Sequence, residues 1–555
     1  MNLISVCTIS AVLAFATAVK GAACPPLGPV FPQPTNLVNS SAFQTALKNL
    51  TASLDLAFKT QNSSYGAFPA SDTYSIQVFS SSDHASLWEY YRRGANLSTS
   101  SAPTINGDTV FRIGSASKLL AVYTLLVEAG DHVFADPVTK YVPELEGKDI
   151  WDDVTIGSIT AHLAGIFPDV IDLSTSPLKN EGFQYPDAYP RLSADEEEPC
   201  QANITVCTRS KFLKSLESSR FSYLPNTTPA YSNGGFALLG YVIESITGKS
   251  FEDALKSALV EPLGLTHTTG MKPNVSHIGA IKFNESYSAW TFSLTGATAE
   301  GGIYSSANDL SAIGRSMLNS TLLSSNTTRG WLKPVTFTSS LTGAVGRPWE
   351  IFRAPIGPTS NNRVIDVYTK GGSLPSFETM LAVIPDFNVG FTILISTAEN
   401  SGPNPAAELI LDIILPVLDE VGRQNANATI SGTYTATGSL NSSVTISSSP
   451  NNPGLSLDRW ISNGTDMLME LDPSAAGMRL YPSNVDAGNS SLSAWKAEVN
   501  KKNTGPYGTC TGWFNIGRPE YGRYSLDDWV FTLASNGKAE SLAIKAMKVV
   551  LNRSS

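Results

Sequence analysis

A serine and a lysine three residues apart are the first feature of this sequence that could carry out chemistry. Ser115 and Lys118 begin an almost wholly apolar run that continues to Leu126. Residues three apart lie on the same face of a helix, and a helix that is apolar all round belongs in a core. The N-terminus of such a helix offers free backbone N–H groups and positive potential near Ser115. A hydroxyl beside an amine at this point is one form of activated nucleophile; the alternative is a capping serine beside a solvated lysine.

A second candidate group is Tyr231-Ser232-Asn233, at a turn that enters an apolar segment. A tyrosine hydroxyl transfers protons when a nearby cation lowers its pKa. Taken alone, the triplet is equally typical of a core tyrosine followed by a capping asparagine.

A third candidate group is Lys370-Gly371-Gly372-Ser373, directly after a predicted strand over residues 364–368. Glycines allow a backbone to approach a ligand closely, and a strand edge can donate an N–H to a developing oxyanion. The alternative is a β-turn with a surface lysine.

In this order, the three groups resemble the motifs of the serine β-lactamase and penicillin-binding-protein superfamily, with the nearest similarity to class C β-lactamase-related esterases and peptidases and to fungal secreted β-lactamase-like proteins. Ser115-x-x-Lys118 resembles the nucleophile motif, the tyrosine triplet the Y-x-N motif, and the lysine segment the K-T-G or H-T-G strand motif. The accessory segments 136–138, 161–166 and 300–310 also fit. The resemblance covers roughly residues 40–420.

The resemblance implies the catalytic roles. Ser115 would attack an acyl carbonyl, and Lys118 and Tyr231 would share its proton. The backbone N–H groups of Ser115 and Ser373 would form the oxyanion hole. Removing one donor from such a hole costs on the order of a few kcal/mol of transition-state stabilisation.

The resemblance also implies that Asn233, Lys370, Gly372 and Ser373 bind the substrate, with Lys370 holding a substrate carboxylate. Gly371 departs from the family pattern, because threonine is usual there and its hydroxyl can bind a carboxylate. The departure favours an esterase, amidase or acyltransferase over a true β-lactamase.

The elements that must position these residues indicate an α+β protein. The resemblance implies a β-lactamase/transpeptidase-like fold, an antiparallel sheet flanked by helices plus an all-helical lobe, and short alternating runs beyond residue 423 predict a C-terminal all-β domain. Hydrophobic spacing predicts helices over residues 41–59, 155–165, 234–247, 251–260, 310–317 and 406–421, and strands over residues 75–79, 86–91, 364–368, 379–384 and 390–395. The C-terminal runs are residues 432–435, 444–446, 467–471 and 529–533.

Length and the N-terminal residues set the domain organisation. A chain of 555 residues is too long for one ordinary core. We predict a signal peptide over residues 1–22, a β-lactamase-like catalytic domain over residues 23–423 and a C-terminal β-rich domain over residues 424–555. The apolar start favours a cleaved secretory signal, although it lacks a positive n-region; the alternative is an uncleaved anchor. The long loop over residues 168–208 is typical of a lid or wall of a cleft.

Cysteines and glycosylation motifs also favour secretion. Cys7 would leave with the signal, so four cysteines remain, which is an even number in an oxidising compartment. Three pairings are possible, of which we favour Cys200–Cys207 together with Cys24–Cys510. About fifteen N-x-Ser/Thr motifs predict N-glycans and a disulfide-bonded extracellular glycoprotein.

Charge and histidine content exclude several other functions. The net charge of −10 without a basic run argues against a nucleic-acid partner. No segment beyond the signal predicts stable membrane insertion, the histidines form no metal-binding cluster, and no cofactor is predicted. His162 is interpreted as structural, on a helix away from the three motifs. The absence of a G-x-S-x-G motif argues against an α/β-hydrolase.

The sequence therefore predicts a secreted serine hydrolase that acts through an acyl-enzyme on a small ester or amide. Two alternatives remain. One is an acyltransferase that uses the same acyl-enzyme, and the other is a non-catalytic binding glycoprotein on the same scaffold. The substrate's identity and the oligomeric state do not follow from the sequence.

Overall fold

The computed structural model describes residues 25–95, 97–167, 208–274, 278–283, 288–291, 296, 298–356, 363–398, 401–472, 477–485, 488–499 and 512–554. Its contacts divide the chain into two compact units, of which the larger is Gln33–Ala354 with Ile365–Val421, and the smaller is Met1–Pro32, Pro355–Val364 and Gly422–Ser555. The predicted signal peptide, all five cysteines and nearly all of the loop 168–208 lie outside the described residues.

An eight-stranded sheet forms the centre of the larger unit, in the order β4-β3-β12-β11-β10-β9-β8-β7. Its strands are β3 (Thr73–Ser80), β4 (Trp88–Arg92), β7 (Thr336–Phe337), β8 (Gly343–Val345), β9 (Glu350–Ile356), β10 (Arg363–Leu374), β11 (Phe377–Ile384) and β12 (Val389–Ser396). The pairing of β10 with β11 is antiparallel and places Lys370 opposite Leu381 and Ser373 opposite Glu378. The predicted strands and their antiparallel arrangement are confirmed.

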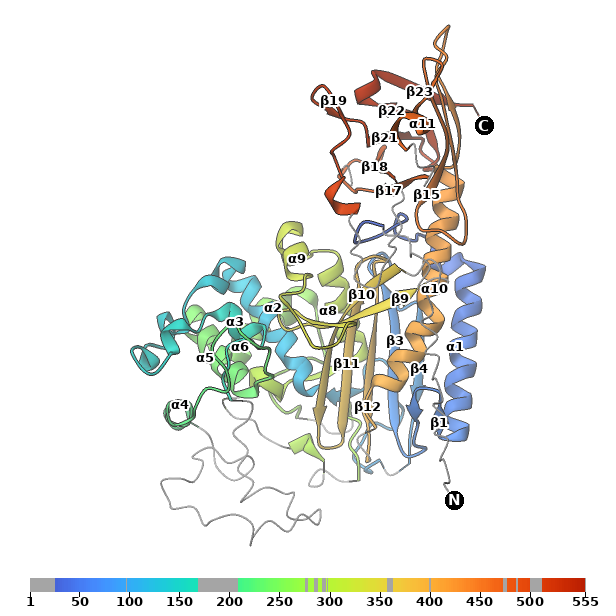
Figure 1. Cartoon of the computed structure of the whole chain (residues 1–555). Coiled ribbons are helices and arrows are strands. Elements are labelled where there is room, and N and C mark those ends of the chain that lie inside the picture. Colours follow the sequence, from blue (N-terminus) through green and yellow to red (C-terminus); the bar gives the residue numbers. More distant parts are fainter. Residues whose placement is uncertain are drawn as a thin grey trace, which may run out of the picture. The chain divides into compact units, whose positions relative to one another are not determined.

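Helices cover both faces of this sheet (Figure 1). On one face, Phe58 of α1 (Ser41–Thr60) packs edge-on against Tyr74, with ring centroids 5.0 Å apart, and stacks on Tyr90. On the other face, α8 (Ala307–Leu318) has Gly314 where a β-carbon would come within 2.3 Å of the Phe79 ring. Alternate residues of β3 thus contact different helices, which is why every residue of β3 is buried.

The helical lobe contains most of the remaining helices. They are α2 (Ser117–Ala129), α3 (Ile156–Thr160), α4 (Arg209–Ser218), α5 (Asn233–Thr247), α6 (Phe251–Leu255), α7 (Glu261–Leu263) and α9 (Ser325–Trp331). The predicted helix over 155–165 is shorter than expected, because His162 and Gly165 have φ values of 56° and 70° and cannot continue it. The predicted helix over 251–260 is interrupted, since a π-helical turn joins α6 to α7. The predicted helix over 406–421 is longer and forms α10 (Asn404–Thr429).

The smaller unit is built around a nine-stranded sheet, and the additional pairing of β14 with β15 closes this sheet on itself, leaving β16 outside the ring. Its strands are β13 (Gly432–Thr435), β14 (Ser443–Ser447), β15 (Leu455–Ser462), β16 (Thr465–Asp466), β17 (Met478–Pro482), β18 (Leu492–Val499), β21 (Asp528–Leu533), β22 (Ala539–Ile544) and β23 (Val549–Arg553). Trp460, Trp495 and Trp529 are buried in its core. The predicted strand over 467–471 is wrong: the segment is the helix α11 (Met467–Leu471), because the Asp466 side chain accepts a hydrogen bond from the Leu468 N–H and caps a first turn.

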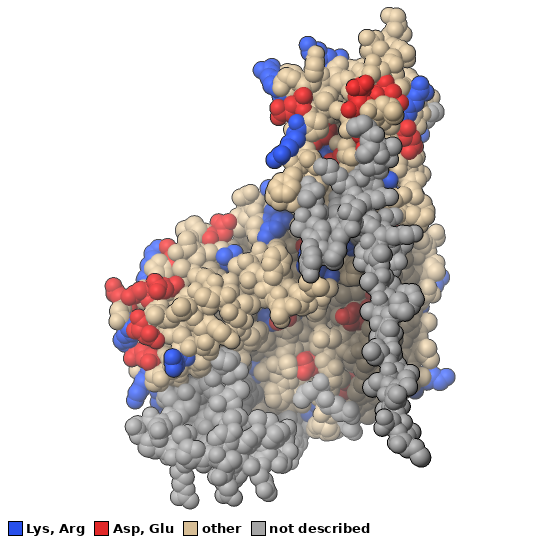
Figure 2. Space-filling view, viewed as in Figure 1, with Lys and Arg blue, Asp and Glu red and all other residues tan. Residues whose placement is uncertain are grey.

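Charged side chains are scattered over the described surface. On the face drawn in Figure 2, Lys and Arg lie singly or in small groups among Asp, Glu and wide uncharged areas. Within the described ranges, no helix combines the length and the apolar character needed to cross a bilayer.

Candidate active site

Ser115 lies in a 3₁₀ turn, Gly114–Ala116, that leads directly into α2. The turn follows strand β5 (Val110–Arg112), and the Ile113 N–H donates to the Ile303 carbonyl at 3.1 Å. The apolar side chains of α2 from Leu119 to Leu126 are buried. The prediction placed Ser115 in the first turn of the helix, and the structure places it one turn earlier, at the end of a strand that is fixed in the core.

Lys118 is fully buried and donates to three oxygen atoms. Its Nζ lies 3.1 Å from Ser115 Oγ, 2.5 Å from Asn233 Oδ1 and 2.6 Å from the Glu300 carbonyl oxygen. Burial lowers the pKa of Lys118, against the opposing influence of Tyr231 and Glu300. An amine with a lowered pKa and a hydrogen bond to the serine hydroxyl is able to take part in removing its proton.

Tyr231 lies between the two lysines of the motifs. The Nζ atoms of Lys118 and Lys370 are 5.0 Å and 5.2 Å from the centroid of its ring, and Lys118 Nζ donates to Ser115 Oγ. Burial alone would raise the pKa of Tyr231, but the positive charges of Lys370 and Lys118, followed by polar interactions with Ser115 and Lys118, lower it below its usual value. Tyr231 remains 40% exposed, so one side of the residue is open to solvent.

Ser232 and His162 fix the position of Tyr231. The Ser232 side chain caps α5 by accepting from the Gly235 N–H at 2.9 Å and donates to the Phe167 carbonyl at 2.8 Å. The Ser232 N–H donates to Nδ1 of His162 at 3.1 Å, and the His162 ring stacks on Tyr231 with centroids 4.3 Å apart.

The interpretation of His162 as distant from the motifs is therefore wrong. Its positive φ removes it from α3 and places the ring under Tyr231. Burial, followed by the charges of Lys370 and Lys118, holds the pKa of His162 well below its usual value. A neutral ring is required for Nδ1 to accept the Ser232 N–H, so the His162 ring that stacks on Tyr231 is uncharged.

The Lys370 segment forms the end of β10 beside the Ser115 turn. A β-carbon on Gly372 would lie 2.0 Å from the Ile113 carbonyl oxygen and 2.9 Å from the Ser115 nitrogen. A β-carbon on Gly114, which has a φ of 49°, would lie 2.8 Å from the Ser373 nitrogen. Only glycine permits this approach, and the approach brings the backbone nitrogens of Ser115 and Ser373 to the same place.

The side chains of Lys370 and Ser373 each meet a carboxylate. Lys370 Nζ donates to Glu350 Oε1 at 2.7 Å, and the Ser373 hydroxyl donates to Glu378 Oε1 at 2.7 Å. Burial alone would lower the pKa of Lys370, but Glu350 and Tyr231 raise it. Because the Ser373 hydroxyl is already engaged, the backbone N–H is the group of Ser373 that suits an oxyanion.

The structure thus brings together all seven residues predicted from the motifs: Ser115, Lys118, Tyr231, Asn233, Lys370, Gly372 and Ser373. The sequence did not indicate Glu350 or the Glu300 carbonyl. Glu350 lies 20 residues from Lys370 and has no motif around it. The Glu300 carbonyl is supplied by a π-helical turn, Thr298–Gly302, in one of the accessory segments. Among the described residues there is no group of three His, Cys, Asp or Glu side chains that could hold a metal ion.

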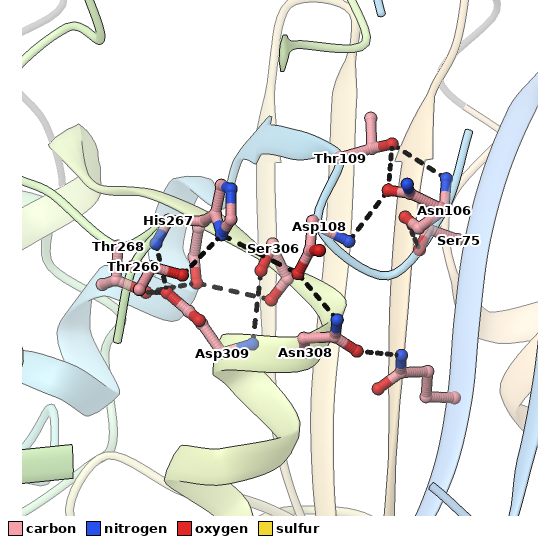
Figure 3. Close-up of polar contacts among 12 residues, drawn as sticks. Ser75, Asn106, Asp108, Thr109, Thr266, His267, Thr268, Ser306, Asn308 and Asp309 are labelled. Atoms are coloured by element: carbon pink, nitrogen blue, oxygen red, sulfur yellow. Dashed lines mark hydrogen bonds and ion pairs between the residues drawn. The ribbon is translucent and has the colours of Figure 1, made fainter. Parts of the chain in front are cut away.

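The end of that same accessory segment has a structural role (Figure 3). Asn308 donates to Asp108 at 2.7 Å and accepts from Gln77 of β3. Asp309 accepts from the His267 N–H and the Thr268 hydroxyl, both at 2.8 Å. These bonds tie the start of α8 to the sheet, and strand β6 (Tyr304–Ser306) just before it pairs with β5, which leads to Ser115.

Comparison with known proteins adds independent evidence. Residues 86–414 match the family described as Beta-lactamase, and residues 422–555 match a family described as "Beta-lactamase-like-like, C-terminal domain". The chain is 29% identical over 481 residues to "Beta-lactamase-like protein" of Arthroderma benhamiae, covering 84% of this chain and 78% of the relative. It is 28% identical over 419 residues to "Probable hydrolase M10" of a Phoma species, covering 72% of this chain and 67% of that protein.

A solved class C β-lactamase from Rhodobacter sphaeroides is 19% identical, with 68% of this chain and 100% of that chain covered and a TM-score of 0.47. The family match spans more than half of the chain and includes the Ser115, Tyr231 and Lys370 segments. The chain belongs to the Beta-lactamase family and is a serine hydrolase of the β-lactamase type.

Proposed function

We propose that the protein is a secreted hydrolase that cleaves small esters or amides through an acyl-enzyme on Ser115. The observation that carries this proposal is the position of Tyr231, whose ring lies beside the ammonium groups of Lys118 and Lys370, while Lys118 donates to Ser115 Oγ. A phenol in this place has a lowered pKa and reaches the proton that must leave the serine.

In the first step, Ser115 Oγ attacks the substrate carbonyl while its proton passes to the pair formed by Tyr231 and Lys118. Two protonation states of the pair serve this step: an ionised tyrosine beside a charged lysine, or a neutral tyrosine beside a neutral amine. The negative charge on the carbonyl oxygen is stabilised by the N–H groups of Ser115 and Ser373. The pair then donates the proton to the departing alcohol or amine, and a water molecule hydrolyses the acyl-enzyme by the reverse path.

Hydrolysis is favoured over acyl transfer by one relative, since the Phoma protein carries the name "Probable hydrolase". Adding an alcohol or amine acceptor and identifying the products separates the two reactions. A transfer product that exceeds the free acid at low acceptor concentration would identify an acyltransferase.

The proposal is tested by labelling and turnover of the purified protein. Wild type is expected to hydrolyse p-nitrophenyl esters and to react with a fluorophosphonate probe, and Ser115→Ala is expected to lose both. Ser117→Ala is the matched control, because Ser117 is two residues away but fully buried, with its hydroxyl accepting from the Ile303 N–H at 3.1 Å. Mapping the labelled peptide to any residue other than Ser115 would reject the proposal.

Secretion remains a separate part of the proposal and rests on the apolar N-terminal run and the density of N-x-Ser/Thr motifs. Protein recovered from the medium of an expressing fungal host is expected to begin near residue 23 and to lose mass on treatment with an N-glycosidase. Retention in the cells with an intact N-terminus would contradict it.

A further inference from the structure

Glu350 places a carboxylate at the exposed end of a buried cation. Its Oε1 lies 2.7 Å from Lys370 Nζ and its Oε2 accepts from the Gly371 N–H at 2.9 Å. The Lys370 side chain is 1% exposed, whereas the Glu350 side chain is 42% exposed. A molecule that approaches this part of the site from solvent therefore meets the carboxylate before the ammonium group.

Gly371 and Glu350 fit each other. A β-carbon on residue 371 would lie 3.3 Å from Glu350 Oε2, so a larger side chain would have to displace the carboxylate. Threonine, which is usual at this position in the resembling motif, would bring a hydroxyl donor to the same space. In this chain, Gly371 leaves room for the negatively charged Glu350 carboxylate instead.

The charges around Ser115 balance without a substrate. Lys370 and Glu350 form one ion pair. In either of the two protonation states that serve catalysis, the pair formed by Lys118 and Tyr231 is also neutral overall: the tyrosine is ionised beside a charged lysine, or both groups are uncharged. His162 is buried and accepts the Ser232 N–H, so it adds no positive charge, and Glu378 adds further negative charge when it ionises. In these states, the described residues around Ser115 offer a substrate carboxylate no unmatched cation, and the carboxylate would face Glu350.

We infer that Glu350 is a specificity-determining residue, and that the site takes acyl substrates whose group beside Lys370 is uncharged or cationic and excludes those that carry a carboxylate there. This inference rests on the proposed function, because it concerns substrates of the Ser115 acyl-enzyme. Glu350 also positions Lys370 beside Tyr231, so the test must separate selectivity from a general loss of activity.

The experiment compares matched esters of opposite charge. The acyl series consists of neutral p-nitrophenyl butyrate, anionic mono-p-nitrophenyl succinate and cationic p-nitrophenyl 4-trimethylammoniobutyrate. The leaving-group series consists of neutral phenyl acetate and anionic 3-carboxyphenyl acetate. Wild type is expected to show a kcat/KM at least tenfold lower for the anionic member than for the neutral member in one or both series. Glu350→Gln keeps the shape of the side chain and an acceptor for the Gly371 N–H but removes the charge. It is expected to raise kcat/KM for the anionic member, relative to that for the neutral member, at least tenfold.

A matched control is Asp366→Asn, which removes a carboxylate from β10, the strand beside that of Glu350. Asp366 accepts from Arg353 of β9 at 3.1 Å. This variant is expected to leave the anionic-to-neutral ratio at the wild-type value. If Glu350 only positioned Lys370, Glu350→Gln would lower kcat/KM for all members equally, and the inference would be overturned.

A second measurement needs no variant. Because Glu350 is partly exposed, raising NaCl from 50 to 500 mM shortens the Debye length and screens its charge, and the wild-type rate on the anionic esters is expected to rise relative to the neutral ones. A ratio that stays constant with salt, or equal rates on anionic and neutral esters, overturns the inference while ester turnover and Ser115 labelling persist. Loss of that labelling and turnover in wild type would instead reject the proposed function itself.

Discussion

Substitution of Gly372 by alanine should disrupt the oxyanion hole without removing any polar side chain of the site. The new β-carbon would lie 2.0 Å from the Ile113 carbonyl oxygen, 2.8 Å from the Ala116 nitrogen and 2.9 Å from the Ser115 nitrogen. All three are backbone atoms of the segment that carries Ser115, and a close carbon–oxygen contact is about 3.3–3.6 Å. Strand β10 must therefore retreat by about 1 Å, and the methyl group would also cover the Ser115 N–H.

Misplacement by about 1 Å costs on the order of 10²-fold in rate, and loss of one oxyanion donor costs about 10²–10³-fold. We therefore expect Gly372→Ala to lower kcat/KM on p-nitrophenyl acetate by about 10²–10³-fold, which corresponds to roughly 2.7–4 kcal/mol of transition-state stabilisation. Stopped-flow or steady-state release of p-nitrophenolate measures the rate, and circular dichroism at 222 nm verifies that the variant is folded.

The neighbouring glycine supplies the comparison. A β-carbon on Gly371 would meet only Glu350 Oε2 at 3.3 Å and the Thr379 carbonyl at 3.9 Å, so Gly371→Ala is expected to lose less than about tenfold on the same neutral ester. Gly330→Ala, in α9 with no atom within 4 Å of the new carbon, serves as the remote control. A wild-type rate for Gly372→Ala, or an equal loss for Gly371→Ala, would refute the reasoning about close backbone approach.

Three further predictions address the proton chemistry and the smaller unit. Tyr231→Phe should lower kcat/KM by about 10²–10⁴-fold with an unchanged melting temperature; full activity would remove tyrosine from the mechanism. If the ionised form of Tyr231 is the base, activity is present above its pKa and lost as pH falls. Lys370→Met removes a charge that lowers this pKa, so the acidic limb of the pH–kcat/KM profile should move toward higher pH, and an unmoved limb would contradict this role. Burial, followed by the charge of Asp527, raises the pKa of Glu498 to about 7. The folded state therefore holds more protons than the unfolded state between pH ~4.5 and ~7. The free energy of unfolding should fall by about 3 kcal/mol as pH rises through that window. In Glu498→Gln, thermal unfolding should lose this dependence, and a slope equal to that of wild type would count against it.

Much of the catalytic unit could be predicted because its signals are local. The apolar run after Ser115 specifies a buried helix, and Gly248 ends the apolar segment that forms α5, whose N-cap is Ser232 and not the asparagine considered from the sequence. Alternating and apolar runs specify the central strands. The family resemblance then joins three distant segments that no local pattern could bring together.

The remaining features depend on tertiary contacts. Glu350 of β9 reaches Lys370 on the neighbouring strand β10, and its acidic side chain looks like any solvated residue in the sequence. His162 was misplaced because helix spacing continues past the point where its positive φ ends α3. The run 467–471 is predicted as a strand, but the Asp466 side chain caps a first turn and the segment forms the helix α11. In each case a single long-range or capping interaction outweighs a short-range preference.

The two lysines of the site have the same charge in solution but different roles in the fold. Burial lowers the pKa of Lys118, which donates to a hydroxyl, an amide oxygen and a backbone carbonyl. Lys370 is equally buried, yet the Glu350 carboxylate holds its pKa above the usual value. Groups whose environments push their pKa values apart divide the acid–base work between them. In the proposed mechanism, Lys118 is therefore the lysine that exchanges a proton with Tyr231, and Lys370 is the lysine that stays charged. Removal of Glu350 should then alter the charge that the substrate meets more than it alters the path of the proton.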